Sequence, residues 1–254
     1  MMRPTCRVMA VVLGVAALLL PSALGGERAE AKFKIEKADE YDPLIDPADF
    51  VDAYGDPLPI DNLYMPLVPG TSYLYEGETE DGIEEILMYV THETKDILGV
   101  PCTVVHETEW VDGVLAEDTF DWFAQDVSGH VWYFGEFTVA YEPGEPPSTE
   151  GSWEAGVDRA KPGIVMLADP RSGDAYRQEY YEGEAEDLAK VLNTDVSVSI
   201  AYGDFDGCLR TKEWTPLEPG SVEHKHYAPG IGLVLVRELT GGTVEIELVG
   251  IAAE

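Results

Sequence analysis

Basic residues are scarce in this chain. It has 16 lysines and arginines against 49 aspartates and glutamates, which gives a formal net charge of −33 at pH 7. Nucleic-acid-binding proteins neutralise phosphates with Lys and Arg, and anionic membrane surfaces attract the same side chains, so this balance argues against both partners. The acidic surplus is typical of a very soluble chain, with calcium binding as the sharper alternative. No D-x-[DN]-x-[DN]-G loop of the EF-hand type is present.

Cysteine is also rare, with three in the whole sequence. Cys6 lies in an N-terminal stretch that we expect to be removed, which leaves Cys102 and Cys208. An exported chain meets an oxidising compartment, which favours a disulfide between these two; two separately buried thiols are the alternative. No C-x-x-C is present, so the sequence gives no redox or structural zinc signal.

The short motifs of common catalytic sites are missing as well. The sequence has no G-x-S-x-G, no H-E-x-x-H, no Cys–His nucleophile signature and no nucleotide-binding loop. No motif therefore names a reaction.

Residues 1–25 have the pattern of an export signal. Arg3 and Arg7 form a basic start, Val8–Leu20 is an apolar run, and Ala23-Leu24-Gly25 offers small residues for cleavage. The run is shorter than a typical membrane-spanning helix. We therefore expect an exported mature protein, periplasmic or extracellular, without a transmembrane segment.

The rest of the chain divides into two parts. Residues 26–65 are acidic and rich in proline, which predicts an extended N-terminal arm. Residues 66–254 carry about a dozen runs of β-branched and aromatic residues between Gly, Pro and Asp turns, which predicts a single β domain. We expect an antiparallel meander that forms a half-barrel or a two-layer sandwich. One short helix is expected near 182–192, where apolar residues fall at helical spacing behind acidic residues.

Glu117–Tyr141 predicts the central hairpin of this domain. With Ser128-Gly129 at the turn, Asp121 lies opposite Glu136, and Phe123 lies opposite Phe134. Large aromatic residues then occupy both faces. A strand pair covered on both sides is typical of a sandwich or of a barrel that encloses a ligand.

A second turn, Asp112-Gly113, extends the hairpin to a third strand and brings His106 toward the two acids. His106, Asp121 and Glu136 could then bind a divalent metal or perform acid–base chemistry, with Glu85 as a weaker member. The alternative is a buried hydrogen-bonded cluster that fixes strand register. Because a one-residue slip exchanges the two faces of a strand, this set depends on the register.

Other side chains are candidates for ligand contacts. Trp132, Phe134 and Phe123 are expected to line an apolar cavity. Arg177 and Glu179 alternate with aromatic residues, so Arg177 could clamp a carboxylate; a structural ion pair is the alternative. His224 and His226, two apart on one strand, also suit a divalent metal, although no third ligand is identified.

Several runs in the body of the chain resemble a family of uncharacterised exported bacterial proteins. The matching runs are LVPGTSYLYEG, EDTFDWFAQD, GHVWYFGE, GSWEAG with KPGIVM, YRQEYYEGEAED and EHKHYAPGIGLV. The resemblance supplies no activity. The strand layout is also similar to lipocalin-type and lipoprotein-carrier half-barrels, which enclose apolar ligands.

The leading functional hypothesis is an exported, non-enzymatic binding protein that holds a small or apolar ligand in a cavity between strands. The first alternative is a metal-dependent or acid–base enzyme that uses His106, Asp121 and Glu136. The second is a structural or Ca²⁺-binding envelope protein.

Overall fold

The computed structural model describes residues 33–38, 40–79, 81–239 and 244–254. The expected export signal, residues 1–25, lies outside these ranges, as does the start of the expected arm. The described part is almost entirely β-structure, with one short 3-10 helix, η1 (Pro47–Phe50). The strands are β1 (Ile60–Asn62), β2 (Met65–Leu67), β3 (Thr71–Glu78), β4 (Ile83–Ile97), β5 (Val100–Val111), β6 (Val114–Gln125), β7 (Val131–Ala140), β8 (Trp153–Glu154), β9 (Lys161–Met166), β10 (Ala175–Arg177), β11 (Glu179–Tyr180), β12 (Leu188–Ile200), β13 (Gly203–Trp214), β14 (Glu223–Ala228), β15 (Gly232–Glu238) and β16 (Val244–Ala253).

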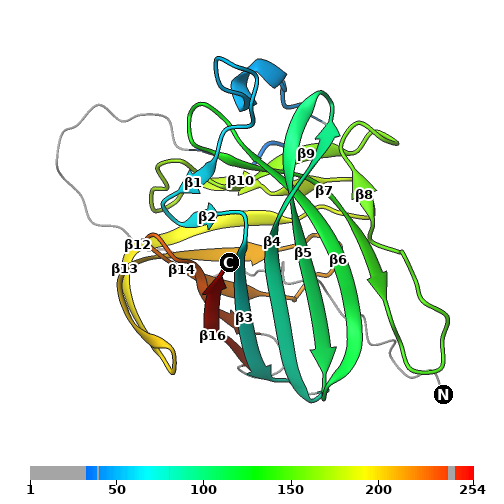
Figure 1. The fold of residues 1–254 in the computed structure, drawn as a ribbon, viewed down its shortest axis with the longest axis vertical. Coiled ribbons are helices and arrows are strands. Elements are labelled where there is room, and N and C mark those ends of the chain that lie inside the picture. Colours follow the sequence, from blue (N-terminus) through cyan, green and yellow to red (C-terminus); the bar gives the residue numbers. More distant parts are fainter. Residues whose placement is uncertain (1–32, 39, 80, 240–243) are drawn as a thin grey trace.

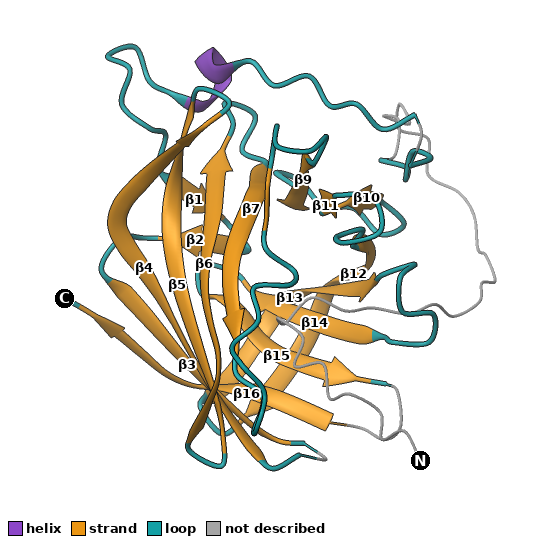
Figure 2. Cartoon of the chain, turned by 90° about the vertical axis from the view of Figure 1, so that its right-hand side faces the viewer, coloured by secondary structure: helices purple, strands orange, loops and turns teal. Residues whose placement is uncertain are grey.

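Two meanders build the main sheet. Strands β3 to β7 follow one another as antiparallel neighbours, and so do β12 to β16. Pairing of β16 with β3 joins the two meanders into one 14-stranded sheet. The sheet curves so strongly that β4–β7 and β12–β15 form two facing walls (Figures 1 and 2). This confirms the predicted mainly β, antiparallel class.

The two edges of the sheet meet at Gln178. At one edge β10 pairs with β12, and at the other β11 pairs with β9. Gln178 alone separates β10 from β11 along the chain, so this residue links the edges and the sheet becomes a nearly closed barrel. A Cβ atom at Gly163 of β9 would lie 2.3 Å from the carbonyl carbon and oxygen of Gln178. A glycine is therefore needed for the edges to approach this closely.

The predicted helix near 182–192 is wrong. Glu182 to Glu184 form a tight turn closed by the bridge between Tyr181 and Ala185, and β12 begins at Leu188. Gly183 has a φ of +81°, which ends any helix there. The backbone of β12 pairs along its length with β13 instead. Tertiary pairing therefore overrides the helical spacing of the apolar residues.

Two bulges set the register of the central hairpins. Asp121 lies opposite Glu136, as predicted, but Phe123 lies opposite Tyr133 rather than Phe134. Next to the β6–β7 loop, the pairing differs by one residue from that expected for a Ser128-Gly129 turn. An extra residue in β7 around Gly135 restores the expected pairing further along the strands. Gly135 has a φ of +126°, and a Cβ there would lie 2.3 Å from the Trp153 carbonyl oxygen. On the other side of β6, Ala116 is an extra residue that shifts the pairing with β5.

The N-terminal arm packs against one end of the barrel. The Phe50 side chain is 3% exposed and lies edge-on to Phe134, with the ring centroids 5.6 Å apart. Strands β1 and β2 form a separate two-stranded ribbon. The Gln125 side-chain oxygen of β6 accepts hydrogen bonds from the backbone N–H groups of Asp61 and Asn62, at 3.1 and 2.9 Å. These bonds fix the ribbon to the barrel.

The predicted disulfide is wrong. Cys102 of β5 and Cys208 of β13 are both free and fully buried thiols. Five strands, β14, β15, β16, β3 and β4, separate β13 from β5 along the sheet. The thiols are thus two separate parts of the core, which was the stated alternative.

Candidate functional site

The barrel encloses a cavity of about 510 Å³. This volume lies within the range of small-molecule sites in proteins. Its lining has two chemically different sides. The apolar side comes from β2 to β5, β15 and β16, and includes Leu67, Tyr73, Tyr75, Ile86, Met88, Val105, Leu233 and Ile246.

The opposite side of the cavity is acidic. It comes mainly from β5 to β7, from the Gln178 junction and from β13 and β14. The carboxylate side chains that line the cavity are Glu107, Glu117, Asp121, Glu136, Glu142, Glu150, Glu179, Glu184, Asp187, Glu213 and Glu218. Among the described lining residues, Lys225 is the one lysine or arginine.

Asp121 and Glu136 form the centre of the acidic side. They lie directly opposite each other on β6 and β7. Burial raises the pKa of Asp121 to about 7, although the Tyr133 hydroxyl donates a 2.6 Å hydrogen bond to its carboxylate. Burial and the nearby Asp121 carboxylate raise the pKa of Glu136 well above its ordinary value. At neutral pH this pair therefore retains protons that exposed carboxylates would have lost.

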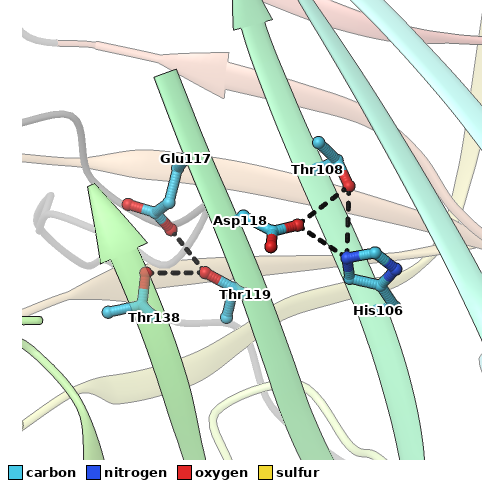
Figure 3. Close-up of polar contacts among 6 residues, drawn as sticks. All are labelled: His106, Thr108, Glu117, Asp118, Thr119 and Thr138. Carbon is cyan, nitrogen blue, oxygen red and sulfur yellow. Dashed lines mark hydrogen bonds and ion pairs between the residues drawn. The ribbon is translucent and has the colours of Figure 1, made fainter. Parts of the chain in front are cut away.

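The acidic side extends along β5 and β6 through Glu107 and Glu117. Burial, and then the Asp121 and Glu117 carboxylates, raise the pKa of Glu107 to about 8. The Thr119 hydroxyl lies 2.9 Å from Glu117 Oε1 and 2.7 Å from Thr138 Oγ1, which connects β6 to β7 (Figure 3). Burial raises the pKa of Glu117 despite these hydroxyl contacts.

Glu213 and Lys225 form the most fully bonded part of the lining. The Glu213 carboxylate accepts hydrogen bonds from Thr211 at 2.7 Å, from Tyr227 at 3.0 Å and from the Gln178 side-chain nitrogen at 3.2 Å. Lys225 Nζ lies 3.2 Å from Glu213 and 3.7 Å from Glu223. The charge of Lys225 is thus balanced by Glu213 and Glu223, and no other lysine or arginine is found among the described lining residues.

Gln178 adds an acceptor without a partner. Its side chain is 3% exposed, lines the cavity and is oriented by the bond from Nε2 to Glu213. Its Oε1 atom is buried and accepts no hydrogen bond. A buried acceptor without a donor costs roughly 1–3 kcal/mol, so a ligand that donates a hydrogen bond here would recover this free energy.

The structure brings part of the predicted ligand set to the cavity. Phe123 and Glu179 line it, and Phe123 stacks on Tyr133 with the ring centroids 4.9 Å apart. Trp132 and Phe134 pack near Phe50, on the other face of β7, because Tyr133 occupies the register position expected for Phe134.

Arg177, also in the predicted ligand set, is buried between two aromatic rings outside the cavity. Its guanidinium carbon lies 5.5 Å from the Tyr41 ring centroid and 4.9 Å from that of Tyr180. This side chain forms no ion pair with any described residue.

The predicted metal set is not brought together. The extra residue Ala116 places His106 opposite Phe120 and Asp121 opposite Val105, so His106 and Asp121 point to opposite faces of the sheet. His106 Nε2 lies 2.6 Å from Asp118 Oδ1 (Figure 3). The His106 ring stacks on the Phe120 ring on the outer face of the sheet. Glu85 lies opposite Trp110, away from His106. Within the described ranges, no group of three or more His, Cys, Asp or Glu side chains is arranged to hold a metal ion.

Sequence reasoning missed Gln178, Glu213 and Lys225. No local pattern marks them, because Glu213 meets Lys225 through the pairing of β13 with β14, and Gln178 reaches Glu213 from the closing edge of the sheet. The alternation of side chains along β5 and β6 could have predicted that Glu107 and Glu117 line the cavity. That prediction would have required knowledge of the bulge at Ala116.

Comparisons with known proteins give structural neighbours only. No protein-family model matches the chain, and no curated protein matches its sequence. A crystal structure from Bacteroides fragilis NCTC 9343, described as a candidate exported protein with a YmcC-like fold, has a TM-score of 0.43 and 15% sequence identity. A candidate lipoprotein from Parabacteroides distasonis ATCC 8503 has a TM-score of 0.42 and 11% identity. Each alignment covers 75% of this chain and 99% of the neighbour.

No helix in the described part of the chain is both long and apolar enough to span a membrane.

Proposed function

We propose that the chain is exported and that the mature protein binds a small ligand inside the barrel. The N-terminal pattern of residues 1–25 supports export. The ligand has an apolar body and an amine or similar cationic, hydrogen-bond-donating group. The observation that carries this proposal is the excess of buried carboxylates, facing an apolar wall, with the cavity's lysine already paired to Glu213.

The charge of the ligand follows from the raised pKa values. Asp121, Glu136 and Glu107 hold protons because burial and mutual repulsion disfavour their charged forms. An ammonium group between them supplies the opposite charge and stabilises their ionised forms. A carboxylate or phosphate ligand would instead add to the repulsion. The unpartnered Gln178 oxygen also selects for a donor.

Calorimetric titration of the mature protein with three eight-carbon probes tests this proposal. At pH 8, n-octylamine should bind more tightly than n-octanol, and octanoate should bind least. Octylamine binding should release protons, which makes the measured enthalpy depend on the ionisation enthalpy of the buffer. Equal binding of the amine and the alcohol would contradict the cationic part, and binding of none of the three would contradict the cavity proposal.

A matched pair of variants locates the site. The double substitution Asp121→Asn with Glu136→Gln should weaken octylamine binding about tenfold or more, since hydrogen bonds to charged groups contribute roughly 1.5–3 kcal/mol. Asp118→Asn, on the outer face of the same strand, should leave the affinity for octylamine unchanged. An unchanged affinity in the double variant would place the amine elsewhere.

A further inference from the structure

The outer face of the barrel carries a row of basic side chains. Lys190 of β12 lies opposite Lys212 of β13, and His224 of β14 lies opposite Arg237 of β15. The β13–β14 register pairs Arg210 with His226 and Glu213 with Glu223, which places Lys212 opposite His224. One continuous row, Lys190–Lys212–His224–Arg237, therefore crosses four adjacent strands. Arg210 and His226 lie beside it on the same face.

This face points away from the cavity. Side chains alternate along each strand, and Glu213, Lys225 and Tyr227 are the neighbours that line the cavity. The two basic side chains at the centre, Lys212 and His226, are 5% and 4% exposed. Lys190, Arg210, His224 and Arg237 are half-buried around them. Two buried basic side chains thus lie at the centre of this face, with four half-buried ones around them.

Its charges are not balanced by the protein. Arg237 pairs with Glu245 of β16, with Nε and Oε1 2.7 Å apart. Lys190, Lys212 and Arg210 form no ion pair with any described residue, and Lys212 lies over the Trp214 ring at 4.2 Å from its centroid. On the same face, the neighbouring strand β16 carries Glu245 and Glu247, and Glu247 accepts a hydrogen bond from the Ala201 N–H.

Two buried nitrogen atoms on this face lack partners. Arg210 Nε and His226 Nδ1 are both inaccessible to solvent and form no hydrogen bond. These two residues lie directly opposite each other on β13 and β14. An unsatisfied buried donor such as Arg210 Nε costs roughly 1–3 kcal/mol, and the like charges of Lys190 and Lys212, which lie opposite each other on adjacent strands, are also destabilising. Although the chain has 49 Asp and Glu residues, only Arg237 among these lysines and arginines forms an ion pair with a described residue.

We propose that this outer face is an oxyanion site for a phosphoryl group, free or carried by a small ester. The ligand would accept hydrogen bonds from Arg210 and His226 and neutralise Lys190 and Lys212. Arginine and lysine together suit the several oxygens of a phosphoryl group. Adjacent strands lie about 4.8 Å apart, so the row spans about 14 Å, which allows a diphosphate to contact several members. The site is separate from the cavity and independent of the ligand proposed there.

Titration of the mature protein with inorganic phosphate and pyrophosphate tests this inference. Both anions should raise the melting temperature, pyrophosphate more than phosphate, and more than sodium chloride of equal ionic strength. In nitrogen NMR spectra the ring signals of His226 should shift, and its pKa should rise when the anion binds. No binding up to 10 mM, or an effect equal to that of chloride, would overturn the proposal.

Variants distinguish specific anion binding at this face from nonspecific attraction of anions to basic side chains. Lys190→Gln and Arg210→Gln should each weaken pyrophosphate binding about tenfold, whereas Lys37→Gln, an exposed lysine on the arm, should not. Lys190→Gln should also raise the melting temperature without anion, because it relieves repulsion with Lys212, so loss of folding cannot explain weaker binding. Octylamine binding in the cavity should be unchanged in both variants.

If anionic phospholipid vesicles bind but soluble phosphate and pyrophosphate do not, a membrane surface is the partner and the small-ligand proposal fails.

Discussion

At the scale of single residues, the carboxyl groups inside the barrel behave differently from those on the surface. Asp121 and Glu107 have pKa values of about 7 and 8, because burial and neighbouring acids disfavour their charged forms. An acid whose pKa is raised by folding stabilises the folded state fully below its unfolded pKa. That contribution is lost as the pH rises through the folded pKa.

Asp121→Asn therefore should change stability little at low pH and increase it at high pH. At pH 3 Asp121 is largely protonated in both the folded and the unfolded state, so the substitution should change the unfolding free energy by less than about 0.5 kcal/mol. At pH 8 it removes an unfavourable buried charge and should stabilise the protein by roughly 1–3 kcal/mol. Urea unfolding at the two pH values measures both effects.

Glu93→Gln, at an exposed position, is the control and should shift stability little at either pH. A loss of stability at pH 8 in the Asp121 variant would show that the carboxylate is ionised and well solvated there.

The sequence located the acid pair but not its surroundings. Asp121 and Glu136 were placed opposite each other because both lie near one turn. Lys225 and Gln178 join them only through the closure of the sheet, which no local spacing encodes.

At the scale of the structural elements, the contact between β9 and Gln178 that closes the sheet leaves no room for a side chain at Gly163. Gly163→Ala should destabilise the fold by about 2 kcal/mol or more, because its Cβ would lie 2.3 Å from the Gln178 carbonyl group and 2.6 Å from the Glu179 nitrogen. Thermal unfolding followed by circular dichroism measures this loss.

Gly250→Ala is the matched control, since the nearest atom to its added Cβ is Leu74 Cβ at 3.8 Å. Equal melting temperatures for the two variants would mean that the sheet edges do not approach as described.

Strand content and hairpin turns were predictable from the sequence, whereas the bulges at Ala116 and Gly135 were not. One extra residue moved His106 from the expected site to the outer face.

At the scale of the whole molecule, the described fold is held by a continuous core without a disulfide between Cys102 and Cys208. Both thiols should react with a thiol reagent in denaturant, and the Cys102 thiol should be protected in the native protein because burial raises its pKa. A reducing agent should leave the melting temperature unchanged. An intact mass two hydrogens lower than the sum of the residues would contradict this prediction.

The sequence by itself determined the class of this protein, because β-branched and aromatic runs between turn residues specify antiparallel strands. The acid surplus argues against a nucleic-acid partner, which stays a prediction. Tertiary structure decided which side chains meet. The meeting of β10 and β11 at Gln178 creates the cavity, and the four-strand alignment of Lys190, Lys212, His224 and Arg237 creates the basic row. Local propensity acts over a few residues, whereas these contacts join residues that only closure and register bring together.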